Sequence, residues 1–295
     1  MPKYYLAAAA LRFFSLHPRL QAVYRTLGKR KHNRPVTCRY ARWVWEQTVA
    51  ADVLDFDSRL LELGTGWTHA NSLYAALAGQ PAIAAFDVVD NRSLASLQYQ
   101  LPFLLEDMRG NDQLDGAALA EAERKAALVG EAPDFEEAYK ILNLHYQVRA
   151  DGVPRFPPAS FDMIYSMDVL EHVQREDFKA AARHWHGLLK PGGTFIAQVG
   201  LDDHLAHYDS GKSPKHYLRH SEMFWAMLLE NDLQYINRLT ASEILQALCA
   251  AGFTIEETEI EACDPARLTV HPNYRTQSPE DLSAVRLTLR ARASA

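Results

Sequence analysis

The first quarter of the chain ends with the segment Arg59-Leu60-Leu61-Glu62-Leu63-Gly64-Thr65-Gly66-Trp67-Thr68-His69. Its first five residues form a mostly apolar run of strand length, and the two glycines that follow predict a sharp turn that enters a helix. Glycine is needed in such a turn because the backbone bends tightly and must let a ligand approach without a Cβ in the way. The segment therefore predicts the first strand and the ligand-binding turn of an α/β domain.

Strand-like runs continue after this turn and alternate with helical spacing of apolar residues. Such alternation favours a Rossmann-like, mainly parallel sheet with helices on both faces. Thr240 and Glu243 predict a capping box at the start of a late helix. The runs that we expect to be strands are 59–63, 83–89, 145–148, 161–166, 194–199, 253–259 and 285–291.

The chain divides into an N-terminal extension and one catalytic domain. Residues 3–27 and 37–54 have helical spacing and flank the basic stretch Gly28 to Pro35, so we expect a helical extension or lid over 1–58. The catalytic domain then covers 59–295. Within it we expect a helical insertion at 91–144, after the second strand, and an acceptor-side segment at 201–240.

Composition indicates an ordinary globular protein, with 48% hydrophobic and 23% charged residues. No apolar run approaches the roughly 20 residues needed to cross a bilayer, so we expect no transmembrane segment. The three cysteines lack the paired spacing of a zinc site or a disulfide framework, which favours a reducing, cytoplasmic compartment. We assign no metal ligands from composition or spacing.

Charge is distributed unevenly along the chain. Ten of the first fifty residues are Lys or Arg and one is acidic, although the net charge of the whole chain is −6. This basic N-terminus is open to three interpretations: a surface for anionic lipid or substrate, a targeting segment, or a solvated helical lid. Peripheral membrane contact and an oligomer therefore stay open. The acidic remainder disfavours nucleic acid as a partner.

The glycine turn is a poor dinucleotide site. The third glycine of that motif is His69 here, and Glu62 would place a carboxylate near the phosphates. Both features suit a cationic ligand that lacks phosphate. A P-loop is excluded for Gly211-Lys212-Ser213, since its earlier glycine is Ala206 and Pro214 follows where a helix should run.

Asp87 ends the second strand, where a carboxylate can accept the hydroxyls of a ribose. With this residue and the turn in register, the chain resembles the class I S-adenosylmethionine-dependent methyltransferases. The resemblance runs from about residue 59 to 200 and includes Ala150-Asp151, Ser160 to Val173 and Leu189 to Thr194.

That resemblance implies a seven-stranded sheet with an antiparallel last strand and S-adenosyl-L-methionine as cofactor, with S-adenosyl-L-homocysteine as product. The cofactor-binding residues that we expect are Glu62, Gly64, Thr65, Gly66, Asp87, Asp151, Ser166 and Met167. The family's usual third glycine is Thr68 in this chain.

Methyl transfer to a hydroxyl needs a group that removes the proton, and histidine is the usual one. Four histidines lie between residues 204 and 220, after the fifth expected strand, where open α/β sheets place their ligands. We expect His204, His207 and His172 to be catalytic. The expected reaction is O-methylation of a small molecule or glycan in natural-product or polysaccharide biosynthesis. Transfer to carbon, nitrogen or sulfur, or a non-catalytic cofactor-binding module, is the alternative.

Asp168-x-x-Glu171-His172 predicts two carboxylates and an imidazole on one face of a helical turn. Some ubiquinone-pathway and small-RNA ribose O-methyltransferases look similar here and use such groups to hold a divalent metal, to which His204 or His207 would add a ligand. Other relatives keep Leu-Glu-His without a metal, so a divalent metal stays open and is not favoured.

Overall fold

The structure is a computed structural model that describes residues 3–29, 35, 38–51, 58–80 and 82–294. Most of the predicted basic stretch Gly28 to Pro35, and the end of the helix expected over 37–54, lie outside these residues. In the part of the chain that is described, no helix combines the length and the apolar character that a membrane crossing requires.

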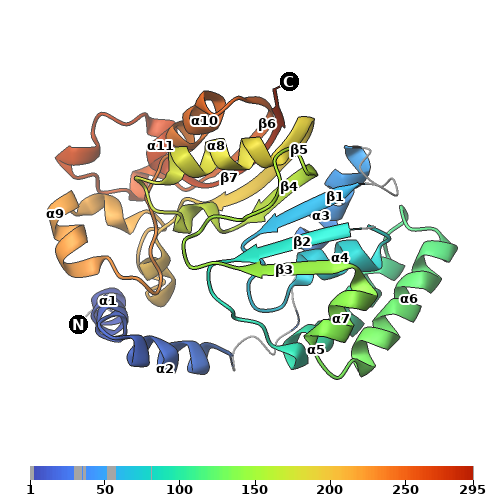
Figure 1. Cartoon of the computed structure of the whole chain (residues 1–295). Coiled ribbons are helices and arrows are strands. Elements are labelled where there is room, and N and C mark those ends of the chain that lie inside the picture. The colour runs from blue at the N-terminus through green and yellow to red at the C-terminus, as the bar shows by residue number, and fades with distance from the viewer. Residues whose placement is uncertain (1–2, 30–34, 36–37, 52–57, 81, 295) are drawn as a thin grey trace. The chain divides into compact units, whose positions relative to one another are not determined.

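Seven strands form one mixed sheet in the order β3-β2-β1-β4-β5-β7-β6, with the last strand antiparallel (Figure 1). Pairing between β1 and its neighbours β2 and β4 is parallel, as is that between β2 and β3. The Rossmann-like fold class is therefore confirmed. The strands are β1 (Arg59–Leu63), β2 (Ala82–Asp87), β3 (Leu144–Val148), β4 (Phe161–Met167), β5 (Leu189–Gly200), β6 (Phe253–Ala262) and β7 (Ala284–Ala293).

The fifth strand begins earlier than predicted. The stretch Lys190 to Gly193, which precedes the expected strand 194–199, is part of β5, with Gly192 at a φ of 77°. Lys190 Nζ donates to both carboxylate oxygens of Asp162 at 2.7 and 2.9 Å, which ties this stretch to β4. A Cβ on Gly193 would lie 2.9 Å from the Lys190 carbonyl oxygen, so this close passage needs glycine.

The helical insertion after β2 is confirmed and consists of three helices. Each helix begins with a side chain that caps its first turn: Ser93 accepts from Ser96 N, Asp115 from Ala118 N, and Asp134 from Glu137 N. These helices are α5 (Leu94–Arg109), α6 (Gly116–Glu131) and α7 (Phe135–Leu142). The other helices are α1 (Lys3–Ser15), α2 (Pro18–Lys29), α3 (Cys38–Ala50), α4 (Ala70–Leu77), α8 (Phe178–Leu188), α9 (Glu222–Phe224), α10 (Ala241–Ala250) and α11 (Pro279–Ser283).

The chain forms two compact units. The first, here called the glycine-loop unit, comprises Gly28–Met167, Gly187–Phe195 and Ala293–Ala295. The second, here called the histidine unit, comprises Met1–Leu27, Asp168–His186 and Ile196–Arg292. The N-terminal residues are therefore divided between the two units.

The glycine-loop unit has its core around β1 and α4. Six of the eight residues of α4 are buried, and α3 packs against this helix. Helix α6 packs against both α5 and α7 and also contacts α4. The apolar run of β1 is covered as the sequence predicts, because Leu60 and Leu61 are fully buried.

The histidine unit includes the first helix in its core. Tyr4, Ala8 and Leu11 form a buried stripe on one face of α1, at the spacing of a helix that faces a core. The Tyr4 hydroxyl also donates to Asp203 Oδ2 at 2.7 Å. The stripe packs into a cluster with Leu205, Ala206, Tyr217, Leu218, Trp225, Leu229, Ile236 and Tyr274.

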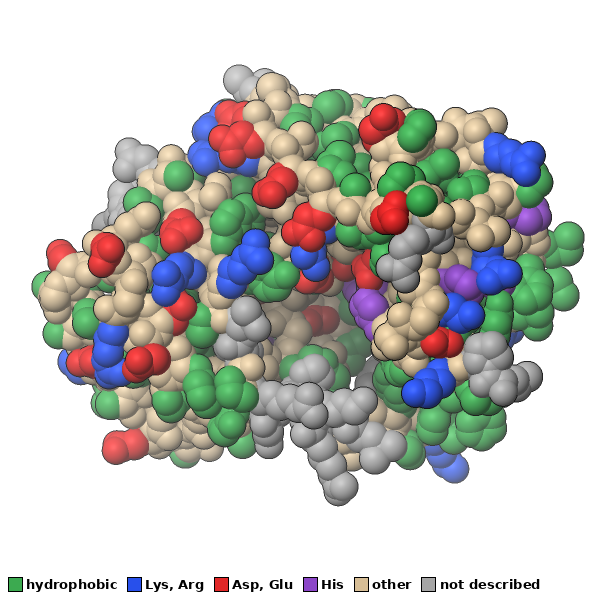
Figure 2. All heavy atoms as spheres, turned by 180° about the vertical axis from the view of Figure 1, so that it is seen from behind, with side chains coloured by type: hydrophobic (Ala, Val, Ile, Leu, Met, Phe, Trp, Pro, Cys, Tyr) green, Lys and Arg blue, Asp and Glu red, His purple; other side chains and the backbone are tan. Residues whose placement is uncertain are grey.

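Figure 2 shows one face of the molecule, on which acidic and basic side chains are scattered among hydrophobic ones. A large patch of one charge would steer ligands of the opposite charge toward it. Over most of this face, acidic and basic side chains are mixed and form no such patch.

Candidate active site

The glycine loop joins β1 to α4 and requires its two glycines. Gly64 and Gly66 have φ values of 76° and 68°, a left-handed conformation that other residues rarely adopt. The Gly64 and Thr65 N–H groups donate to the Phe86 carbonyl oxygen at 2.8 and 3.2 Å. The loop is therefore fixed to the end of the neighbouring strand β2.

Asp87 holds the other side of this loop. Its carboxylate accepts from the N–H of Gly66 at 2.9 Å and from those of Val88 and Val89 at 2.7 and 3.3 Å. Burial raises the pKa of Asp87 despite these three hydrogen bonds. The predicted ribose acceptor thus also orders the backbone of the predicted cofactor loop.

Glu62 lies inside the unit, with only 1% of its surface exposed. Its carboxylate accepts from the Ser72 hydroxyl and, at 3.0 Å, from the Asn71 side-chain amide. Burial is the main cause that raises the pKa of Glu62 to about 7, while these hydrogen bonds lower it. The residue therefore ties β1 to the first turn of α4.

Ser166 is fully buried near the end of β4, in register with Leu63 of β1, and Met167 beside it is half-buried. Asp151 lies in a turn after β3, is exposed, and pairs with Arg149 and Arg155 at 2.6 and 3.2 Å. The Arg149 hydrogen bond is the largest cause that lowers the pKa of Asp151 to about 2. The predicted cofactor residues thus lie at or near the carboxyl ends of four neighbouring parallel strands, β3, β2, β1 and β4.

The histidine unit brings the three predicted catalytic residues together. The ring centres of His172 and His204 lie 5.2 Å apart, and those of His204 and His207 lie 5.5 Å apart. His172 is the last residue of the 3₁₀ turn η1 (Leu170–His172). His204 is the first residue of a second 3₁₀ turn, η2 (His204–Tyr208), and His207 is its fourth. We call these three residues the histidine cluster.

Two of these rings have fixed partners. His207 Nε2 lies 2.6 Å from Asp202 Oδ2, and this hydrogen bond is the largest cause that raises the pKa of His207. His172 Nδ1 lies 2.5 Å from the Tyr235 carbonyl oxygen, which can only accept, so Nδ1 carries the proton. Burial is the largest cause that lowers the pKa of His204 to about 4, so this ring is neutral at pH 7.

A buried carboxylate lies beside this cluster. Glu171 is 3% exposed, and its Oε2 has no hydrogen-bond partner among the described residues. One ligand atom from each of Glu171, His172 and His204 lies within 4.8 Å of the others. This donor set suits a divalent metal ion, since imidazole nitrogen and carboxylate oxygen are ordinary ligands of such ions.

The predicted helical face of Asp168, Glu171 and His172 is wrong. Asp168 precedes η1 with a φ of 54°, and its side chain accepts from Gln198 Nε2 at 3.0 Å. The left-handed backbone breaks the helical spacing that the sequence indicates, because η1 begins only at Leu170. Asp168 is therefore not part of the metal-ligand group.

A family model described as a methyltransferase domain matches residues 30–258, which include the glycine loop, Asp87 and the histidine cluster. The chain belongs to the class I S-adenosylmethionine-dependent methyltransferase family. It is accordingly an enzyme. No curated protein matches this methyltransferase.

Solved structures with a similar fold include three proteins of low identity. A Galdieria sulphuraria protein, provisionally identified as a sarcosine dimethylglycine methyltransferase, is 12% identical with a TM-score of 0.49, covering 88% of this chain and 85% of its own. An S-adenosylmethionine-dependent methyltransferase from Mesorhizobium loti is 20% identical with a TM-score of 0.43, covering 83% and 96%. Phosphoethanolamine N-methyltransferase 2 from Haemonchus contortus is 16% identical with a TM-score of 0.46, covering 85% and 53%. Fold alone does not identify the substrate of this methyltransferase.

The sequence does not by itself indicate two residues that orient the histidine cluster. Asp202 orients His207, and the carbonyl of Tyr235 orients His172. An acid five residues before a histidine was the signal for the first pair, but only the fold of η2 brings the two side chains together. The second pair joins residues 63 positions apart through a backbone atom, which leaves no signal in residue type.

Proposed function

We propose that this methyltransferase transfers the methyl group of S-adenosylmethionine to a hydroxyl of a small molecule or sugar, with His207 as the general base. The hydroxyl oxygen attacks the methyl carbon while the carbon–sulfur bond breaks and its electron pair returns to sulfur. The products are the methyl ether and S-adenosylhomocysteine. The hydroxyl proton passes to His207 Nδ1.

The hydrogen bond between Asp202 and His207 carries this proposal. A carboxylate that accepts from one ring nitrogen fixes the tautomer and leaves the other nitrogen with a lone pair that can accept a proton. The 62% exposure of the His207 side chain leaves room for an acceptor to approach it. Removal of a proton is what a hydroxyl acceptor requires, whereas an amine or thiol acceptor needs less help.

His204 and His172 serve the acceptor in a different way. His204 is neutral at pH 7 and its ring lies next to the other two, so it offers polar atoms to an acceptor without adding a positive charge to the cluster. The proton on His172 Nδ1 is held by Tyr235, so its Nε2 is free to accept a hydrogen bond. We assign both residues to acceptor positioning.

We assign the cofactor to the glycine loop and the residues around it. The left-handed glycines 64 and 66 keep Cβ atoms away from the ligand, and Asp87 would accept the ribose hydroxyls while it holds the loop. Glu62 would lie on the methionine side, Asp151 toward the adenine, and Thr65, Ser166 and Met167 would border the nucleoside. The cationic sulfur suits a loop that has acids nearby and needs no phosphate site.

Replacement of the base tests this proposal. His207→Gln should lower the rate of label transfer from methyl-labelled cofactor into a metabolite extract by roughly 10²- to 10⁴-fold, because general base catalysis contributes about that much. The affinity for S-adenosylhomocysteine, measured by calorimetry, should stay within about twofold, since the variant changes none of the residues assigned to the cofactor. His145→Gln makes the same change at an exposed position of β3 and should keep the full rate. If His207→Gln keeps the full rate, His207 is not the general base.

A metal-assisted reaction is the second candidate, favoured by the orphaned Oε2 of buried Glu171. Glu171, His172 and His204 would hold the ion, which would supply the acidity that lets a hydroxyl lose its proton. The metal-free proposal predicts that dialysis against a chelator leaves label transfer unchanged. Loss of activity that Mg²⁺, Mn²⁺ or Zn²⁺ restores, and that Glu171→Gln mimics, would favour the metal instead.

A further inference from the structure

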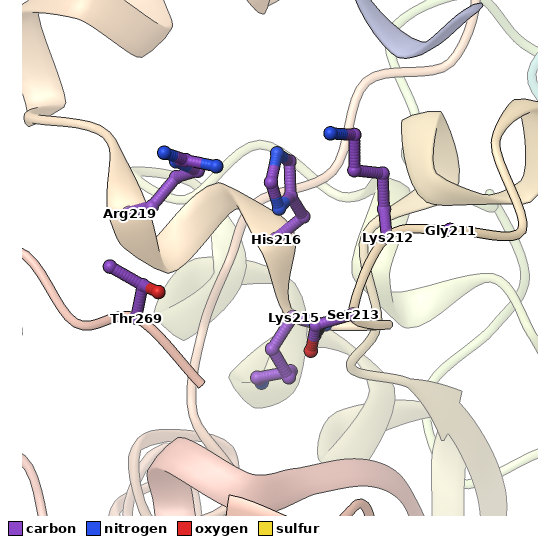
Figure 3. Close-up of a pocket in the computed structure, with 7 residues that line it drawn as sticks. All are labelled: Gly211, Lys212, Ser213, Lys215, His216, Arg219 and Thr269. Carbon is purple, nitrogen blue, oxygen red and sulfur yellow. Dashed lines mark hydrogen bonds between the residues drawn. The ribbon is translucent and has the colours of Figure 1, made fainter. Parts of the chain in front are cut away.

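The histidine unit contains a small basic pocket apart from the residues assigned above. Its volume is about 190 Å³, and it is lined by Gly211, Lys212, Ser213, Lys215, His216, Arg219 and Thr269 (Figure 3). The tripeptide Gly211-Lys212-Ser213, which spacing excludes as a P-loop, lines this pocket, to which the proposed reaction assigns no residue.

The pocket wall carries positive charge without an acid of its own. In Figure 3 the side chains of Lys212, His216 and Arg219 extend to the same side of the segment 211–219. Neither Lys212 nor Arg219 forms an ion pair with a carboxylate of the residues that the structure describes. Uncompensated cations in a concave site attract an anion.

His216 adds a buried polar atom that has no partner. The residue is 9% exposed, and its Nε2 makes no hydrogen bond to any described residue. A buried nitrogen without a partner costs free energy unless a ligand or water satisfies it. Burial is the largest cause that lowers the pKa of His216 to about 4, followed by the charges of Arg219 and Lys212.

The neighbouring charged groups are engaged elsewhere. The Lys215 ammonium extends to the other side of the segment in Figure 3 and donates to the Leu201 carbonyl oxygen at 2.9 Å. The Asp209 carboxylate accepts from the N–H groups of Gly211 and Tyr4 at 3.3 and 3.4 Å. Lys212 and Arg219 are therefore the cations that extend with His216, while the negative charge of Asp209, which is not among the lining residues, also acts on His216.

We propose that this pocket binds a phosphate or sulfate group of a small ligand. Lys212 and Arg219 would form charge-assisted hydrogen bonds to its oxygens, His216 Nε2 would donate a further one, and the hydroxyls of Ser213 and Thr269 would complete the shell. A volume of about 190 Å³ equals that of about six water molecules at roughly 30 Å³ each. There is room for the tetrahedral group and for the first atoms of whatever carries it.

The test titrates the protein with inorganic phosphate, phenyl phosphate and phenol by calorimetry at low ionic strength. Both phosphates should bind and phenol should not. Phenyl phosphate binding at least tenfold tighter than inorganic phosphate identifies the source as an ester, and the reverse order identifies a free ion. Both outcomes support the pocket, and neither requires methyl transfer, so failure of the proposed reaction leaves this test intact.

Variants place the binding in the pocket. Arg219→Gln and Lys212→Gln should each raise the dissociation constant for phosphate at least tenfold. Lys179→Gln removes the same charge at an exposed position of α8 in the same unit. It should change the dissociation constant for phosphate less than twofold. Unchanged S-adenosylhomocysteine affinity confirms that each variant folds. Absence of phosphate binding at millimolar concentration, or equal weakening by Lys179→Gln, overturns the proposal.

Discussion

The glycine loop and the histidine cluster are built in different ways. In the loop, backbone N–H groups of consecutive residues bond to the end of β2 and to Asp87, and left-handed glycines set the turn. In the cluster, side chains from η1 and η2 meet, with His172 oriented by the Tyr235 carbonyl and His207 by the Asp202 carboxylate. The loop is therefore a local structure, while the cluster depends on the packing of its unit. Changes in the loop should alter cofactor affinity and stability, and changes in the cluster should alter rate.

The largest expected effect on the loop side of this comparison is the pH dependence caused by Glu62, which lies in β1 just before the loop. Its pKa is about 7 in the folded protein against an ordinary value of 4.5, so the folded state keeps a proton that the unfolded state loses. The stability from this group is full below pH 4.5, falls as the pH rises to about 7 and is lost above it. The difference amounts to about 3 kcal/mol.

Glu62→Gln should abolish that fall, because the amide keeps the shape of the side chain but cannot ionise. Urea unfolding at pH 5, 6, 7 and 8 would measure it. Glu136→Gln, on the exposed face of α7, is the matched control and should leave the pH dependence of the wild type unchanged. Parallel curves for Glu62→Gln and the wild type would show that Glu62 is already ionised in the folded state.

Asp87→Asn should weaken S-adenosylhomocysteine binding by roughly 10- to 100-fold. The amide cannot accept as many hydrogen bonds as the carboxylate, and one bond to a charged group is worth about 1.5–3 kcal/mol. Asp90→Asn, three residues further along, removes a charge that pairs with Arg92 and should change affinity less than threefold. Calorimetry compares the two variants, and equal affinities would show that Asp87 has no part in holding the cofactor or its loop.

The smallest effect is expected from a methyl group on the loop. A Cβ on Gly66 would meet no atom within 4 Å, so Gly66→Ala is disfavoured only by its φ of 68°, at about 1–2 kcal/mol. The melting temperature should fall by a few degrees, since roughly 2–4 °C corresponds to 1 kcal/mol.

Gly116→Ala is the contrasting change, because this glycine also has open space but begins α6 without a positive φ. It should raise the melting temperature slightly through helix propensity. Scanning calorimetry of both variants would measure the two melting temperatures. A Gly66→Ala protein as stable as Gly116→Ala would show that the loop is not locally constrained.

The sheet and the insertion were predictable because their signals are local. Apolar runs of strand length, the caps Ser93, Asp115 and Asp134, and the capping box of Thr240 and Glu243 all act within a few residues. The sequence prediction of the capping box is confirmed.

The parts that could not be predicted depend on distant contacts. Asp168 leaves helical spacing because its backbone is left-handed, and Gln198 of another strand bonds its side chain. His207 acquires Asp202 only when η2 folds, and α1 reaches Asp203 through Tyr4 across about two hundred residues. No periodicity in the sequence encodes these pairs, since each requires the packed histidine unit.

The acceptor atom is tested most directly by incubating the protein with S-adenosylmethionine that carries a ¹³C-labelled methyl group, together with a metabolite extract, and recording the carbon NMR shift of the labelled product. A hydroxyl acceptor activated by His207 predicts the shift of a methyl ether. A label attached to nitrogen, sulfur or carbon would contradict it.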